Sequence, residues 1–186
     1  MLRSSIRRSS QAAFSLIEVV IALAILTVSI GAVCSTLFTT TGLSRANRET
    51  SLAAEAALSA IEAVRGADFA QAFAQFNVNP NDDAVAPGTA PGASFAVRGL
   101  DVRDGDVDGF VGEILFPGDG TNLREDVLDR ALGMPRDLNG DSVIDAIDHS
   151  GDYVLLPIRV RVEWTGASGN RDLEFVSTVT FPGEAP

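Results

Sequence analysis

A mostly apolar run from Phe14 to Phe38, which contains one charged residue, Glu18, dominates the N-terminal part of the chain. An apolar run of this length predicts a helix that can span a bilayer. The next stretch, residues 44–65, contains neither proline nor glycine and is rich in Ala, Glu and Leu, which favour helix. The helix is therefore expected to continue to Gly66, because glycine commonly ends helices. With about 50 residues at 1.5 Å each, it would be about 75 Å long.

After Gly66 the pattern changes from one long helix to loops and short elements. Three phenylalanines at helical spacing predict a short helix over residues 69–76. Clusters of Pro, Gly, Asn and Asp then indicate a connecting loop. Strands are predicted at residues 94–102 and 110–116, and a short helix at residues 122–132.

The clearest sheet signal lies near the C-terminus. Every second residue over 154–164 is apolar, with charged residues between several of them, which is typical of a half-buried strand. A turn at residues 166–170 leads into a return strand, and Trp164 is expected in the core. Together these elements predict an α+β fold, in which the long N-terminal transmembrane helix packs on a C-terminal antiparallel sheet.

Composition argues against several classes of function. The formal net charge is −11 and there is no basic patch, so no nucleic-acid binding is predicted. The only cysteine, Cys34, lies within the predicted membrane helix, so no intrachain disulfide can form. The only histidine, His149, lacks candidate catalytic partners and is expected at the surface or in a supporting role. Without a nucleophile elbow or a phosphate-binding glycine loop, we predict that the protein is not an enzyme.

Glu18 calls for an explanation, because a carboxylate within a bilayer requires a partner. Cleavage between Ala13 and Phe14 would create a positive amine four residues before Glu18, on the same face of the helix. A cleaved secretory signal normally has a shorter apolar region without an acid. A plain membrane anchor leaves the acid unexplained, and lipoprotein cleavage before Cys34 conflicts with the bulky Val33.

The sequence Phe-Ser-Leu-Ile-Glu at residues 14–18, after a short basic leader, resembles the processing site of type IV pilins and type II secretion pseudopilins. Ala13 stands where that family nearly always has glycine. The resemblance implies cleavage by a prepilin peptidase after Ala13, N-methylation of Phe14 and assembly into a helical filament. Glu18 would then neutralise the amine of Phe14 on a neighbouring subunit. The implied partners are other pilin or pseudopilin subunits, an inner-membrane assembly platform and the lipid bilayer.

The resemblance also implies a domain organisation and a location. Residues 1–13 would be the leader, 14–40 the transmembrane and filament-core half of the helix, 41–66 its amphipathic half, and 67–186 an exported pilin-like β domain. The basic leader places the N-terminus in the cytoplasm, which gives a single-pass protein of the inner membrane. The absent disulfide and Ala13 favour a minor subunit. The alternative is a single-span, membrane-anchored, exported calcium-binding module that does not polymerise.

A second motif begins at Asp137 and predicts a structural Ca²⁺ site. EF-hand loops supply oxygen ligands from positions 1, 3, 5, 7, 9 and 12. In this chain those positions are occupied by Asp137, Asn139, Asp141, the Val143 carbonyl, Asp145 and Asp148. The loop resembles those of EF-hand and dockerin proteins, although Ser142 replaces the turn glycine and the last ligand is the shorter Asp. We expect weak binding, with a Kd of about 10⁻⁵ to 10⁻³ M.

An earlier acidic run predicts a weaker second site. Asp104, Asp106 and Asp108, followed by Gly109, match the first part of the same loop pattern, but position 12 is Leu115. The alternative for the first motif is a solvated Asp-rich turn before the last hairpin, and for the second it is an exposed acidic turn between strands.

Overall fold

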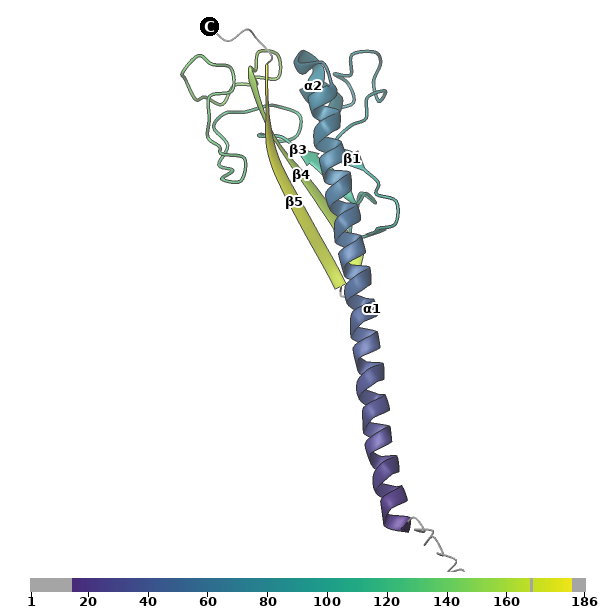
Figure 1. The fold of residues 1–186 in the computed structure, drawn as a ribbon. Coiled ribbons are helices and arrows are strands. Elements are labelled where there is room, and N and C mark those ends of the chain that lie inside the picture. The colour runs from purple at the N-terminus through teal and green to yellow at the C-terminus, as the bar shows by residue number, and fades with distance from the viewer. Residues whose placement is uncertain (1–14, 168, 182–186) are drawn as a thin grey trace, which may run out of the picture. The chain divides into compact units, whose positions relative to one another are not determined.

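The computed structural model describes residues 15–167 and 169–181 (Figure 1). It divides into two compact units, one that ends at Ser44 and one that starts at Arg45. Helix α1 (Leu16–Gly66) is 51 residues long and contributes to both units. The prediction of one helix that ends at Gly66 is therefore confirmed.

In the N-terminal unit, the side chains of α1 are exposed and largely aliphatic. Six of its hydroxyl groups donate to a backbone carbonyl one turn earlier in the helix. Five of them bond the carbonyl four residues before: Thr27, Ser29, Thr36, Thr39 and Thr40. Among the described residues, α1 is the one helix long and apolar enough to cross a membrane. This is the composition that a single-pass anchor requires.

The C-terminal unit contains the rest of α1, the short helix α2 (Phe69–Phe76) and an antiparallel sheet. The strands are β1 (Ser94–Phe95), β2 (Asp101–Val102), β3 (Gly112–Leu115), β4 (Leu155–Gly166) and β5 (Gly169–Thr180). Strand β4 pairs along one edge with the whole of β5 and along the other with both β3 and β2. Strand β1 extends the sheet beyond β3. The predicted α+β fold with an antiparallel sheet is confirmed.

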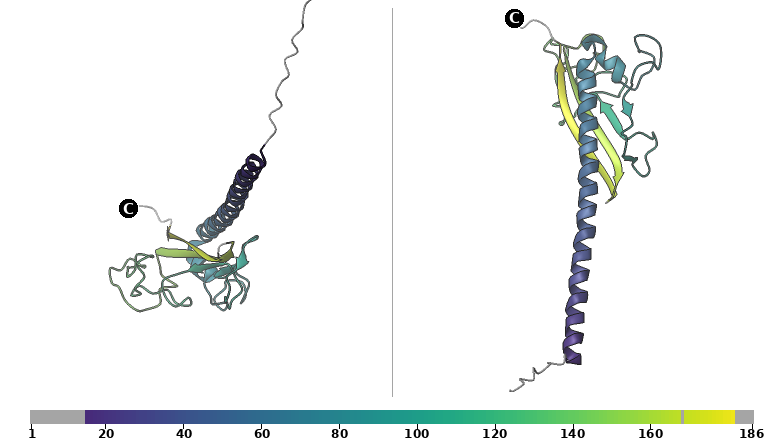
Figure 2. Two further views of the ribbon diagram at one scale, coloured as in Figure 1. Left: turned by 90° about the horizontal axis from the view of Figure 1, so that it is seen from below. Right: turned by 45° about the vertical axis from the view of Figure 1, so that its right-hand side comes forward.

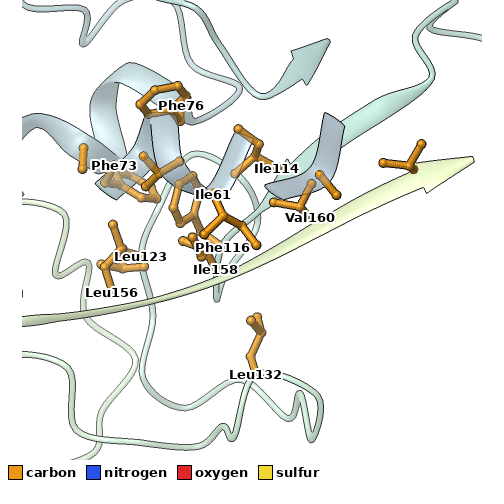
Figure 3. Close-up of a cluster of buried hydrophobic side chains, with 14 of the residues drawn as sticks. Ile61, Phe73, Phe76, Ile114, Phe116, Leu123, Leu132, Leu156, Ile158 and Val160 are labelled. Carbon is orange, nitrogen blue, oxygen red and sulfur yellow. The ribbon is translucent and has the colours of Figure 1, made fainter. Parts of the chain in front are cut away.

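The second half of α1 crosses this sheet and closes the core (Figure 2). Its buried face consists mainly of residues spaced by three or four positions, Ala53, Ala57, Ile61 and Val64. Their partners are alternate residues of β4, which are all fully or almost fully buried: Leu156, Ile158, Val160, Val162 and Trp164. Figure 3 shows Ile61, Phe73, Phe116 and Ile158 within this cluster, in which the ring centroids of Phe73 and Phe116 lie 5.2 Å apart. Every core residue lies in the C-terminal unit, and the expected burial of Trp164 is confirmed.

Two predicted elements differ from the structure. The strand expected at 94–102 is interrupted, because Gly99 adopts a φ of +93° and turns the chain between β1 and β2. The helix expected at 122–132 is absent, and these residues form an irregular loop. Backbone N–H groups in this loop bond to distant acceptors instead of to a helix: Leu123 donates to Asp148 Oδ1 and Arg124 donates to the Pro117 carbonyl. The short helix α2 and the strand within 110–116 are confirmed.

Candidate functional site

The predicted cleavage point between Ala13 and Phe14 lies outside the described residues. Glu18 lies in the first turn of α1, where the helix dipole favours a negative charge. The backbone N–H groups of Glu18 and Val19 both donate to the Ser15 carbonyl, at 3.0 and 3.3 Å. The side chains around Glu18 are aliphatic and exposed, with Leu16 at 82% and Ile17 at 62% exposure. The carboxylate is therefore carried on an otherwise apolar surface.

The acidic loop, residues 137–152, connects irregular segments that precede β4. Asp137 accepts hydrogen bonds from the backbone N–H groups of Gly140, at 2.6 Å, and Ser142, at 2.8 Å. Asn139 and Asp141 each accept from the N–H two residues later, so the loop is a series of Asx turns. Ser142 adopts a left-handed φ of +67°, at the position where calcium loops have glycine. The local backbone turn thus forms without the glycine.

The carboxylates among the six predicted calcium ligands make separate hydrogen bonds. Asp148 Oδ1 accepts from Leu123 N at 2.9 Å and from Ser150 N at 3.1 Å, and its Oδ2 accepts from the Ser150 hydroxyl. Asp145 Oδ1 instead lies 3.2 Å from His149 Nε2. Within the described chain, no three of the predicted carboxylates approach closely enough to share one ion. The calcium site stays a prediction.

The earlier acidic run forms an exposed turn between β2 and β3. Asp106 Oδ1 accepts from Asp108 N at 3.1 Å, and Asp108 Oδ1 accepts from Phe110 N at 2.9 Å. The backbone N–H of Asp104 donates to the hydroxyl of Thr165 on β4, which fixes the turn to the sheet. These contacts account for the turn by itself, and a second calcium site here also stays a prediction.

A cluster that the sequence did not reveal joins two residues of the acidic loop to one residue of the 122–132 segment. It consists of Glu125, Asp145 and His149, whose side-chain ligand atoms all lie within 4.8 Å of one another. His149 is 4% exposed, so of the two expected places, at the surface or in a supporting role, the surface one is wrong. Burial lowers the pKa of His149, but Asp152, Asp145 and Glu125 outweigh it and raise the pKa above its ordinary value. Sequence reasoning missed Glu125 because it lies in the segment for which a helix was predicted.

The N-terminal segment carries the link to known proteins. Residues 8–33 match the family model described as the prokaryotic N-terminal methylation motif. No curated protein and no solved structure matches the chain significantly. The matched residues include the predicted cleavage point, Glu18 and most of the apolar run. The match overlaps the start of α1, which is the one helix in the described part of the chain that is long and apolar enough to cross a membrane.

Proposed function

We propose that this protein is a minor structural subunit of a type IV pilus or of a type II secretion pseudopilus. The observation that carries the proposal is the methylation motif at residues 8–33, which runs directly into helix α1. A prepilin peptidase would cleave after Ala13, and the new N-terminal Phe14 would be methylated. The mature helix would leave the inner membrane and pack against the helices of neighbouring subunits.

Glu18 has a defined role in this proposal. Its carboxylate would pair with the positive amine of Phe14 on a neighbouring subunit, which offsets the cost of placing a charge in an apolar environment. Five hydroxyl groups of the apolar half already donate to the helix backbone, so they add little unsatisfied polarity. Glu18 is then the main polar group that assembly has to match.

Two features favour a minor subunit. The chain has one cysteine, Cys34, and it lies in α1, so the C-terminal unit has no disulfide to stabilise its long loops. Ala13 also departs from the glycine that is usual before the cleavage point.

We propose that calcium, bound through Asp137, Asn139 and Asp141, rigidifies the acidic loop in place of a disulfide.

The first test is mass spectrometry of the N-terminal peptide from protein recovered from its native cell envelope. We expect a chain that begins at methylated Phe14, and we expect Ala13→Gly to be processed at least as completely. If all material retains the leader, the filament proposal fails. The protein would then be a membrane-anchored exported module that does not polymerise.

A second test separates assembly from anchoring. Glu18→Gln removes the charge without a large change in size, so we expect normal membrane insertion but loss of incorporation into filaments. Glu55→Gln is the matched control, because Glu55 is exposed in the second half of the same helix. Sheared filaments and membranes are compared by immunoblot. Equal incorporation of both variants would contradict the proposed role of Glu18.

Calcium is tested by thermal unfolding of the full chain in detergent. We expect millimolar Ca²⁺ to raise the Tm and Asp137→Asn to remove most of that increase. Asp172→Asn, an exposed acid on β5, should retain it. A Tm that does not change with Ca²⁺ would refute the calcium part of the proposal and leave the filament part unaffected.

A further inference from the structure

Three hydrogen-bond acceptors converge at one place in the C-terminal unit. They are Glu125 Oε2, from the 122–132 loop, and Asp145 Oδ1 and His149 Nε2, from the acidic loop. His149 Nε2 lies 3.2 Å from Asp145 Oδ1 and 3.7 Å from Glu125 Oε2. Two carboxylate oxygens this close to a ring nitrogen need a positive charge among them, which either a protonated His149 or a bound cation supplies.

Among the three residues, Glu125 most needs a nearby positive charge, because its side chain is 0% exposed. One oxygen, Oε1, accepts hydrogen bonds from the backbone N–H groups of Leu138, at 2.5 Å, and Asn139, at 3.2 Å. The other oxygen, Oε2, has no hydrogen-bond partner among the described residues and is directed into the cluster. A buried carboxylate oxygen without a partner is costly, so it indicates a missing cation.

The imidazole of His149 is oriented by a fourth carboxylate. His149 Nδ1 lies 3.1 Å from Asp152 Oδ1 and can donate its hydrogen to it. In the neutral tautomer with the proton on Nδ1, Nε2 carries a lone pair and faces Glu125 Oε2 and Asp145 Oδ1. Metal-bound histidines in proteins are commonly held in this way, with the second ring nitrogen bonded to a carboxylate.

We propose that Glu125, Asp145 and His149 bind a divalent cation of the zinc type, and that Asp152 positions the histidine. Ligands about 2.1 Å from a tetrahedral zinc ion lie about 3.4 Å apart, and the two measured separations from His149 Nε2 lie on either side of that value. Imidazole is a usual ligand of zinc, whereas calcium prefers oxygen ligands alone. A water molecule would complete the coordination from the side of Asp145, the most exposed of the three ligands.

The site has a clear structural consequence. It would join the 122–132 loop to the acidic loop, and both lack regular secondary structure. It is distinct from the calcium prediction, because only Asp145 belongs to both ligand sets. Position 9 of a calcium loop often binds through water, so a zinc ion that binds Asp145 directly leaves the other calcium ligands in place.

The test is a Zn²⁺ titration of the metal-stripped full chain in detergent, in competition with a chromophoric chelator. We expect one equivalent of Zn²⁺ to bind and to raise the Tm, also in the presence of saturating Ca²⁺. Asp145→Asn and Asp152→Asn should each weaken binding by about 10-fold to 100-fold. Asp145 and Asp152 are partly exposed, so these variants are expected to fold. The fluorescence of the buried Trp164 shows whether they do.

Further variants make the result decisive. Glu125→Gln should abolish binding, whereas Asp172→Asn should bind as the parent protein does. Asp141→Asn should lower the response to Ca²⁺ and leave the affinity for Zn²⁺ unchanged. The proposal is overturned if the chain binds no stoichiometric Zn²⁺, if Asp145→Asn and Asp152→Asn bind it normally, or if Asp141→Asn weakens it equally. In those cases a protonated His149 accounts for the cluster.

Discussion

Glu49 lies on the buried face of α1 and offers a sharp test of how the helix is fixed to the β4–β5 turn. Its residue exposure is only 7%. Its carboxylate accepts a hydrogen bond from Arg45 Nε at 2.9 Å and another from the backbone N–H of Ala167 at 3.3 Å. Burial opposes ionisation, but the hydrogen bonds from Arg45 and Ala167 outweigh it and lower the pKa of Glu49. We predict that Glu49→Gln destabilises the C-terminal unit.

The size of the effect follows from these two bonds. Hydrogen bonds to a charged group contribute about 1.5–3 kcal/mol when well shielded. Arg45 is 66% exposed, so solvent screens its part, and we expect a loss of about 1–2 kcal/mol at neutral pH. For a chain of this length that corresponds to a decrease in Tm of about 2–8 °C.

The pH dependence separates this explanation from a simple packing defect. A carboxyl group with a lowered pKa in the folded state stabilises the protein above its unfolded pKa of about 4.3. That contribution is lost as the pH falls through the lower, folded-state pKa. The difference in Tm between the parent protein and Glu49→Gln should therefore shrink on acidification from pH 7 to pH 3.

The assay is thermal unfolding followed by circular dichroism at several pH values, with Glu55→Gln as the exposed control. Glu55→Gln should follow the parent protein within about 0.5 kcal/mol at every pH. The reasoning is refuted if Glu49→Gln unfolds at the same temperature as the parent at pH 7. A difference in Tm between the parent protein and Glu49→Gln that stays constant down to pH 3 would refute the electrostatic explanation.

Two other predictions concern the acidic loop and the core. Ser142→Gly should stabilise the protein by about 0.5–1 kcal/mol, because glycine adopts the φ of +67° without steric cost, whereas Ser142→Ala should give no such gain. Urea unfolding of the two variants checks this, and equal stability would show that Ser142 is not strained. Leu156→Ala should cost about 2–5 kcal/mol, since Leu156 is 0% exposed near the start of β4, and a loss below 1 kcal/mol in the same assay would contradict the assigned core.

Local patterns were sufficient to predict the main elements. The residue types of 44–65 predicted the second half of α1, and the period-two pattern of 154–164 predicted β4, because both depend on residues that are close in the sequence. The strand break at Gly99 depends instead on which partner each half pairs with, β3 for β1 and β4 for β2. That choice is not visible in residues 94–102 themselves.

The candidate sites show the same division. The methylation motif is contiguous, so Glu18 and its surroundings could be read directly, and the family comparison covers the same residues. The cluster of Glu125, Asp145 and His149 depends on contacts between separate loops. The backbone N–H of His149 donates to the Leu123 carbonyl at 2.8 Å, and that of Arg136 donates to the Glu125 carbonyl at 3.1 Å. Motif spacings do not describe contacts between residues far apart in the sequence, so the sequence alone could not place Glu125 beside His149.

The order of elements along the chain has a consequence for biosynthesis. The core face of α1 is made early, but the strand that covers it, β4, begins only at Leu155. At 5–20 residues per second, the ribosome needs about 5–20 s to produce the intervening hundred or so residues. During that time Ile61 and Val64 have no sheet to pack against, and their later contacts close a long loop, which slows folding. A nascent chain of this protein is therefore most exposed to aggregation and proteolysis just before its last hairpin is complete.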